Sequence, residues 1–299
     1  MRLYKLIGLE IEALMKEHDE TLENIAKYED ILEHRSSMAK VIIKELTAFK
    51  KAYGKERKTV IDNLKEAVVA AKKIEEQDVV FLMDRFGYAK IVDTSVYERN
   101  KEAANAEYRH IFTCKNTDKI CIFTDKGQMH LLKVLDLPFG KFRDKGTPID
   151  NLSNYNSSEE NFVYITNLGA ICNHKLIFGT KMAMLKIVDG SEFDVAKRTT
   201  AATKLTDGDE VLLVHPVAGN ETIVMQSERD FFLRIAVDSI PEKKKGAVGV
   251  RGMRLADGDA LTAIHLLGEG ESVQTEVKGK SVMLNRLHVA GRDTKGTKK

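Results

Sequence analysis

The chain has few cysteines and no long apolar run. No apolar segment approaches the roughly 18 to 20 residues that a membrane span needs, and the amino-terminal MRLYKLIGLEIEALMKEHDE carries acids where a secretory signal is apolar. Cys114, Cys121 and Cys172 form no Cys-x-x-Cys pair, so the sequence indicates neither a disulfide framework nor a zinc site. These absences predict a soluble, cytoplasmic protein that does not contact a membrane.

Signs of a catalytic or metal centre are also missing. The sequence has no Walker-type phosphate loop, and no Ser, Cys or acid recurs at a fixed offset from the histidines that would build a triad. Two Asp-Gly-Asp segments, at Asp207 and Asp257, could be mistaken for metal ligands, but Asp and Gly are favoured in turns between strands. We therefore expect no catalytic residue, no metal and no cofactor in this chain. The histidines considered are His110, His130, His174, His215, His265 and His288.

Charge of one sign is not in excess either. With 47 Lys and Arg against 45 Asp and Glu, the net charge is +2, which excludes a uniformly basic surface. Any affinity for phosphate must therefore come from local clusters. The cations that cluster are Lys141, Arg143, Lys145, Lys197, Arg198, Lys243, Lys244, Lys245, Arg251, Arg254, Arg292, Lys295, Lys298 and Lys299.

The richest cluster is the stretch EKKKGAVGVRGMRLADGD, residues 242–259. Its glycines let the main chain approach a phosphate closely while the lysines and arginines neutralise it, which suits a nucleic-acid backbone. An ordinary charged surface turn would look similar. The repetition of such clusters along the chain is what favours nucleic acid.

The amino-terminal part has the pattern of two helices. Apolar residues recur at three- and four-residue steps from Leu9 to about Leu32, and again from Met38 to Tyr53, where Gly54 ends the pattern. Ser36 or Ser37 is expected to cap the second helix. The apolar stripes would pack as an antiparallel pair on each other, on a second copy or on their own domain. Crowded apolar residues at the free end predict dimer contacts at Leu3, Leu6, Ile7 and Leu9.

From Asp78 onward the sequence repeats. Three units, VVFLMDRFGYAKIVD, KICIFTDKGQMHLLKV and FVYITNLGAICNHKL, each place a turn glycine between two apolar strands, at Gly87, Gly127 and Gly169. TIVMQSERDFFLRIAV has Asp230 in the glycine place, and SVQTEVKGKSVMLNRL has Gly279. A repeat of about 40 to 50 residues built from hairpins is typical of blades in a propeller-like fold. We expect about five blades with the basic clusters on a shared rim.

These residues resemble a known family, the bacterial type IIA topoisomerases, which comprise DNA gyrase and topoisomerase IV. MRLYKLIGLEIEAL with the helical hairpin ending in KAYGKERKT is similar to the coiled-coil end and exit gate of gyrase A and its topoisomerase IV equivalent. FLMDRFGYAKIVD and GAVGVRGMRLADGD resemble blades of the carboxyl-terminal β-pinwheel of the same proteins. The resemblance implies a mainly β fold, a β-pinwheel of about five blades with exchanged strands, following an antiparallel coiled coil. The expected divisions are 1–54 (exit-gate end and coiled coil), 55–77 (linker, with a helix from about 63 to 75 as the alternative) and 78–299 (β-pinwheel).

The resemblance also implies a function. The chain is expected to be a non-catalytic part of an ATP-dependent topoisomerase that binds and bends duplex DNA around a basic rim, with the cations named above as contacts. Its partners would be DNA, a second copy and the separate ATPase subunit, in the bacterial nucleoid; ATP and Mg²⁺ would act elsewhere in the enzyme. The tyrosine-bearing catalytic domain is not expected here, since no Arg-Tyr dipeptide occurs. The alternative is a protein-interaction propeller on a coiled-coil stalk.

One departure from the family pattern bears on the activity. Gyrase carries a basic, glycine-rich box after the first blade hairpin, whereas residues 96–109 here read VYERNKEAANAEYR. A box-like run, GRDTKGTKK, instead follows the last hairpin. This difference favours a topoisomerase IV-like role over DNA wrapping of the gyrase kind.

Overall fold

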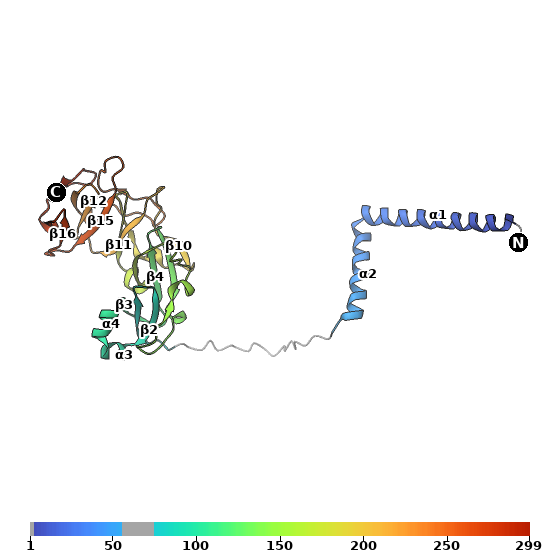
Figure 1. Ribbon diagram of the computed structural model, residues 1–299, viewed down its shortest axis with the longest axis horizontal. Coiled ribbons are helices and arrows are strands. Elements are labelled where there is room, and N and C mark those ends of the chain that lie inside the picture. Colours follow the sequence, from blue (N-terminus) through green and yellow to red (C-terminus); the bar gives the residue numbers. More distant parts are fainter. Residues whose placement is uncertain (1–2, 56–74) are drawn as a thin grey trace. The chain divides into compact units, whose positions relative to one another are not determined.

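The protein is described from a computed structural model, in which residues 3–55 and 75–299 are described, without the side chains of residues 3–9. The chain divides into two compact units, residues 1–71 and 72–299. Helices α1 (Leu3–Glu33) and α2 (Arg35–Tyr53) form the first unit, and the second is built from antiparallel sheets (Figure 1). The predicted linker helix lies outside the described residues. No helix of the described residues is long and apolar enough to span a membrane.

The two predicted amino-terminal helices are confirmed, although their junction differs from the prediction. α2 begins at Arg35 after His34, so Ser36 and Ser37 lie inside the helix and do not cap it. No residue of α2 is buried, and the stripe of α1 is open to solvent, with Leu14 63% exposed. The stripes therefore do not cover each other within one chain. The predicted dimer contacts, Leu3, Leu6, Ile7 and Leu9, have side chains outside the described residues.

The second unit contains four four-stranded sheets and one separate hairpin, confirming the predicted mainly β, pinwheel-like fold. Most hairpin strands are buried on both faces because each sheet is packed between neighbours. In pairing order, the first sheet is β3 (Tyr108–Lys115), β1 (Asp78–Asp84), β2 (Tyr88–Asp93) and β6 (Thr147–Pro148); the second is β10 (Thr199–Ala201), β5 (Gln128–Lys133), β4 (Lys119–Thr124) and β7 (Phe162–Asn167). The third is β11 (Val211–Val217), β8 (Lys175–Thr180), β9 (Met184–Asp189) and β14 (Val250–Arg251); the fourth is β15 (Leu261–Leu267), β12 (Thr222–Ser227), β13 (Phe231–Ala236) and β18 (Thr297–Lys298). The fifth hairpin is β16 (Gln274–Val277) with β17 (Lys280–Met283).

Each four-stranded sheet is completed by a strand from further along the chain. The hairpin β1–β2 pairs with β3, which follows it, and with β6, which follows the hairpin of the second sheet. The strands β10, β14 and β18 complete the second, third and fourth sheets in the same way. Consecutive sheets are thus linked by exchanged strands, as the resemblance implied.

One of the five predicted hairpins is wrong. Asn167 caps a short helix, α5 (Leu168–Cys172), by accepting a hydrogen bond from the Ala170 N–H at 2.6 Å, and Gly169 lies within this helix. The segments on either side belong to different sheets, because β7 pairs with β4 whereas β8 pairs with β9 and β11. The third hairpin turns instead at Ala183, whose φ of 57° is in the left-handed region that glycine usually occupies. The hairpins at Gly87, Gly127, Asp230 and Gly279 are confirmed.

The hydrophobic core is divided among the spaces between neighbouring sheets. Phe81 and Ile122 lie in the core between the first and second sheets, Phe123 and Phe178 between the second and third, and Leu185 between the third and fourth. The first four hairpins therefore contribute side chains to the cores on both of their faces. A fourth core joins the fourth sheet to the fifth hairpin.

The outer face of the first sheet is closed by helices. α3 (Thr94–Arg99) and α4 (Lys101–Glu107) place Val96 and Ala104 against Val80 and Leu82. The segment where the family carries its basic box is therefore a helical cover for the sheet. Within the described residues, no core cluster joins the first sheet to the fifth hairpin. Short 3-10 helices follow the hairpins or their loops, at Val134–Asp136, Ile149–Asn151, Gly190–Phe193, Val237–Ser239 and Leu284–Arg286.

Candidate nucleic-acid interface

The two edges of each sheet are different. The strands β3, β7, β11 and β15, at one edge, contact one another in succession and form the hub of the unit. The short strands β6, β10, β14 and β18 lie at the opposite edge, which we call the outer edge. Whatever precedes these short strands is therefore carried at the periphery, away from the hub.

The predicted basic clusters are on the segments that lead into the short outer strands. We call residues 138–146, 194–198, 241–249 and 288–296 the basic loops. Each runs along the second hairpin strand of the sheet that it completes, through bonds such as Ile91 N to Pro138 O at 3.0 Å and Leu131 N to Arg198 O at 2.7 Å. The equivalent bonds join Lys243 N to Ile187 O and Ala290 N to Arg234 O, both at 2.8 Å. The sheets thus repeat the same loop position four times.

Most of the predicted cations are exposed at this edge. Only Lys243 and Lys245 are half-buried, and both are engaged inside their own region: Lys243 Nζ donates to Val248 O at 3.3 Å and Lys245 Nζ to Glu192 O at 2.6 Å. The exposed ones are Lys141, Arg143, Lys145, Lys197, Arg198, Lys244, Arg251, Arg254, Arg292, Lys295 and Lys298. Arg254 belongs to the same region as the fourth basic loop, because its N–H donates to Thr294 O at 2.9 Å.

Glycine is required where a basic loop crosses the preceding sheet. A Cβ on Gly146 would lie 2.7 Å from Ala89 O, and its φ is 81°; a Cβ on Gly249 would lie 2.7 Å from Leu185 O. Both contacts are with backbone, which does not move aside as a flexible side chain would. The glycines that mark the basic stretch in the sequence therefore serve, at these positions, the approach of the loop to its own fold.

Aromatic rings lie beside three of the lysines, and Lys298 Nζ is 5.7 Å from the centroid of Phe231. Lys145 Nζ lies 4.3 Å from the centroid of Tyr88, and Lys295 Nζ lies 4.9 Å from that of Phe231. Tyr88 and Phe231 each follow the left-handed residue of a hairpin turn, so the two pairs are structurally equivalent. A cation over a ring gains about 0.5–1 kcal/mol at an exposed site, which orders the ammonium group while leaving it accessible.

Acidic residues lie among the cations and reduce the local charge. Asp293 Oδ1 is 3.6 Å from Arg251 Nη1 and 3.7 Å from Arg254 Nε. Arg292 Nη1 donates to Arg251 O at 3.3 Å in the same cluster. Two arginines therefore share one carboxylate, and a third contacts the backbone beside them. Their net positive charge is smaller than the sequence count suggests.

Two cations that the sequence reasoning missed lie beneath the basic loops. Lys90 on β2 and Lys186 on β9 are each only 1% exposed. Their ammonium groups donate to loop carbonyls, Lys90 to Phe142 O and Asp144 O, and Lys186 to Lys245 O and Ala247 O. Burial lowers the pKa of Lys90, and lowers that of Lys186 to about 8. The sequence pattern that could have identified them as buried is a lysine between apolar neighbours, in YAKIVD and MLKIVD.

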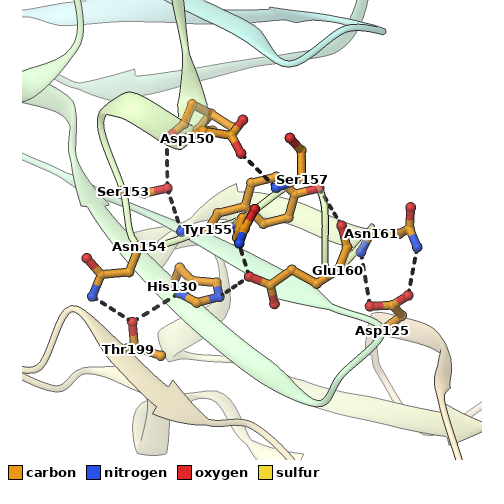
Figure 2. Close-up of polar contacts among 12 residues, drawn as sticks. Asp125, His130, Asp150, Ser153, Asn154, Tyr155, Ser157, Glu160, Asn161 and Thr199 are labelled. Carbon is orange, nitrogen blue, oxygen red and sulfur yellow. Dashed lines mark hydrogen bonds and ion pairs between the residues drawn. The ribbon is translucent and has the colours of Figure 1, made fainter.

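A polar network occupies the equivalent place in the second sheet (Figure 2). His130 Nε2 lies 2.9 Å from Glu160 Oε1, and His130 Nδ1 lies 3.0 Å from Thr199 Oγ1. Tyr155 donates its hydroxyl proton to Glu160 O at 2.9 Å. His130 and Glu160 are 4% and 8% exposed. This constellation therefore ties β5, β10 and the 149–161 segment together and offers no open site for a substrate.

The Asp-Gly-Asp segments are confirmed as turns. Gly208 and Gly258 have φ of 78° and 69°. Asp209 Oδ1 accepts hydrogen bonds from Met182 N and Glu210 N, both at 2.9 Å, and Asp259 Oδ1 accepts one from Ala260 N at 3.0 Å. These carboxylates are engaged with backbone N–H groups. In the part of the chain that the structure describes, no group of three His, Cys, Asp or Glu side chains is arranged to hold a metal.

Comparison with known proteins agrees with this architecture. Residues 174–218 and 221–267 match the family described as the DNA gyrase C-terminal domain, β-propeller. The chain is 30% identical over 314 aligned positions to DNA gyrase A from Lawsonia intracellularis, an alignment that covers 99% of this chain but only 38% of that protein. The chain therefore spans well under half the length of this relative.

Two solved structures have the same fold. The C-terminal domain of DNA topoisomerase IV covers 75% of this chain and 73% of its own, with a TM-score of 0.67 and 20% identity. The E. coli ParC C-terminal domain covers 75% of this chain and 94% of its own, with a TM-score of 0.62 and 11% identity. At these identities the likeness concerns the fold alone.

The fold and the matches define the class of protein. The second unit is a propeller-like fold of sheets linked by exchanged strands, and residues 174–218 and 221–267, across its third and fourth sheets, match the family of the DNA gyrase C-terminal domain. The resemblance to gyrase A and its equivalent among the bacterial type IIA topoisomerases, found from the sequence, is confirmed. The alignment with DNA gyrase A covers 99% of this chain. The prediction of a C-terminal domain of this type is confirmed by the family match over residues 174–218 and 221–267.

Proposed function

We propose that this domain binds duplex DNA along its outer edge and bends it, guiding the segment for strand passage in an ATP-dependent type IIA topoisomerase. The observation that carries the proposal is the recurrence of exposed cations on equivalent loops of four consecutive sheets. Regularly repeated cations along a curved edge match the repeated phosphates of a curved duplex. Cofactors are not required for this role, and we assign none to the chain.

The binding should be electrostatic and tolerant of sequence. The basic loops lie flat against their sheets, and the longest helix of the second unit, α4, has seven residues and covers the first sheet. No described element of this unit is therefore a helix placed to read base edges in a groove. Bending 20 to 30 base pairs by 40 to 90° costs on the order of 1 to 6 kcal/mol. Several basic loops must contact the duplex together to offset that cost.

A salt titration tests the proposal. If about six phosphates are neutralised, the logarithm of the association constant should fall against the logarithm of the salt concentration with a slope near ~5, because each contact releases condensed counterions. Filter binding with a linear duplex measures the slope. A flat response would reject electrostatic DNA binding and would favour the alternative, a propeller that binds a protein partner.

We also propose that DNA is bent here without wrapping of the gyrase kind. The supporting observation is that residues 94–107, at the place of the gyrase basic box, form α3 and α4 against the first sheet. The GRDTKGTKK run leads into β18 and is the regular loop of the fourth sheet, not a relocated box. The full-length protein with its ATPase partner should relax and decatenate DNA. Negative supercoiling in a plasmid assay would contradict this assignment.

The partners of the whole enzyme are part of the same proposal. We infer a bacterial nucleoid location, a separate ATPase subunit and a dimer formed through α1 and α2, because their stripe residues Leu14, Ile25 and Phe49 are 63%, 47% and 65% exposed. Equilibrium sedimentation should give a concentration-dependent dimer mass. Replacing Leu14 and Ile25 together by Ser should shift the protein to monomer, whereas a monomer at every concentration of the unmodified chain would remove the dimer proposal.

A further inference from the structure

Lys186 is buried directly under the third basic loop. Its Nζ lies 2.6 Å from Lys245 O, 3.0 Å from Ala247 O and 3.4 Å from Lys244 O, and 3.3 Å from Ala202 O on the neighbouring sheet's segment. The ammonium group thus donates hydrogen bonds to the carbonyl oxygens of three residues of one loop. These carbonyls accept hydrogen bonds from beneath the loop, and the side chain of Lys244 is exposed on the outside.

The charged groups around Lys186 do not form an ion pair with it. Burial lowers the pKa of Lys186 most, the charge of Glu192 raises it and that of Lys243 lowers it, while the ring of Phe178 lies 5.3 Å from Nζ. Glu192 is used by the loop itself: it accepts from Lys245 N at 3.0 Å and lies 3.3 Å from Lys244 Nζ. The loop is therefore held from beneath by Lys186 and from the side by Glu192.

The arrangement recurs in the first sheet. Lys90 and Lys186 both stand three residues after the left-handed turn residue of their hairpin, Gly87 or Ala183. Both donate to carbonyls of the following basic loop. In the fourth sheet the cation is displaced by one residue, and Arg234 Nη1 donates to Asn285 O at 2.6 Å and Leu287 O at 3.3 Å. Burying a charged group costs free energy unless its N–H donors all find acceptors. Because a buried or half-buried cation recurs near this place in three sheets, we expect it to have a structural role.

We propose that Lys186 is a positioning residue that fixes the basic loop 241–249 in the shape that binds phosphate. The inference rests on the proposed DNA-binding function for its consequence, but the effect on the loop can be measured without DNA. Without three donors at its centre, the loop has buried carbonyl oxygens left unpaired. It would then open toward water and lose the common orientation of Lys244 and Arg251.

The first test replaces the lysine with a residue of similar length. Lys186→Met should increase amide hydrogen exchange over residues 243–251 at least about tenfold in the absence of DNA, with exchange in β1 and β4 unchanged. Duplex affinity should fall by about tenfold. Lys101→Met is the matched control, since Lys101 is exposed on α4 and its removal changes the net charge equally; it should alter neither measurement. Unchanged exchange in the loop would overturn the inference.

The second test needs no substitution and stands if Lys186→Met does not fold. As pH rises through about 8, Lys186 loses its proton and one of its three N–H donors. Loop exchange, corrected for the intrinsic pH effect, and the duplex dissociation constant should both rise across this range. The folded-state pKa lies below the unfolded value, so deprotonation of this group makes the fold more stable from pH 8 to 10.5. The titration of Lys186 itself therefore does not unfold the protein in this range.

The outcomes separate the two proposals. Faster loop exchange at high pH with no change in affinity would support the positioning role and reject a DNA-binding role for this loop. A pH-independent loop would reject the positioning role, whatever the DNA measurement shows.

Discussion

Replacing Lys243, Lys244, Lys245 and Arg251 together by alanine should weaken duplex binding on the order of a hundredfold at 0.1 M salt and lower the salt slope by about 2 to 4, since each phosphate contact contributes about 0.9. Lys244 and Arg251 are exposed and should account for most of the change. Lys243 and Lys245 are half-buried and partly engaged by the loop. Filter binding measures the affinity, and ligation-mediated circularisation measures the bend.

The matched control removes the same kind of charge from the other unit. Lys40, Lys44, Lys50 and Lys51 are exposed on α2, and replacing all four by alanine lowers the net charge as the first variant does. DNA affinity should then change less than about threefold at the same salt concentration, because none of these four lysines belongs to a basic loop. If the two variants lose affinity equally, binding depends on net charge and not on the outer edge. Unchanged bending in the first variant would also contradict the proposal.

Phe123→Ala should lower the free energy of unfolding of the β unit by about 3–5 kcal/mol. Phe123 lies on β4, is fully buried, and meets Phe178 and Phe193 edge to face at centroid distances of 5.9 and 5.1 Å. Its ring fills the space between the second and third sheets. Alanine would leave a cavity that sheets linked by exchanged strands cannot easily close.

Urea unfolding followed by far-UV circular dichroism measures this loss. Phe86→Ala is the control, because Phe86 is 71% exposed on the turn of the first hairpin and should change stability by less than about 0.5 kcal/mol. Equal midpoints for the two variants would show that the sheets do not depend on the packing between them. A separate early transition in Phe123→Ala would show that the sheets unfold one at a time.

The hairpins were the most predictable part of the fold, because their signals are local. Gly87 and Gly127 mark turns between apolar strands, and Asp230 takes the same left-handed conformation with a φ of 63°. The third hairpin escaped detection since Ala183 gives no turn signal, while Gly169 supplied a false one inside α5. A left-handed alanine is held there by tertiary contacts, which sequence periodicity does not report.

The short outer strands were not predictable from pattern. β6, β14 and β18 have two residues each, too few for an alternating period, and each pairs with the hairpin before the preceding one in the chain. The cations of the basic loops were found because lysine and arginine cluster visibly in the sequence. That these loops occupy one edge follows only from the pairing of the sheets. The buried lysines were missed because a lysine in a strand is usually read as a solvent-facing residue.

The exchanged strands also determine how a load applied at the edge is carried. The loop 138–146 leaves the second sheet after β5 and is anchored at its other end by β6 in the first. Tension on any ligand held there is therefore resisted by two sheets at once, and by the aromatic core that joins them. A stiff polymer bent around the outer edge would therefore pull on two linked sheets together, and would not detach one sheet from its neighbours.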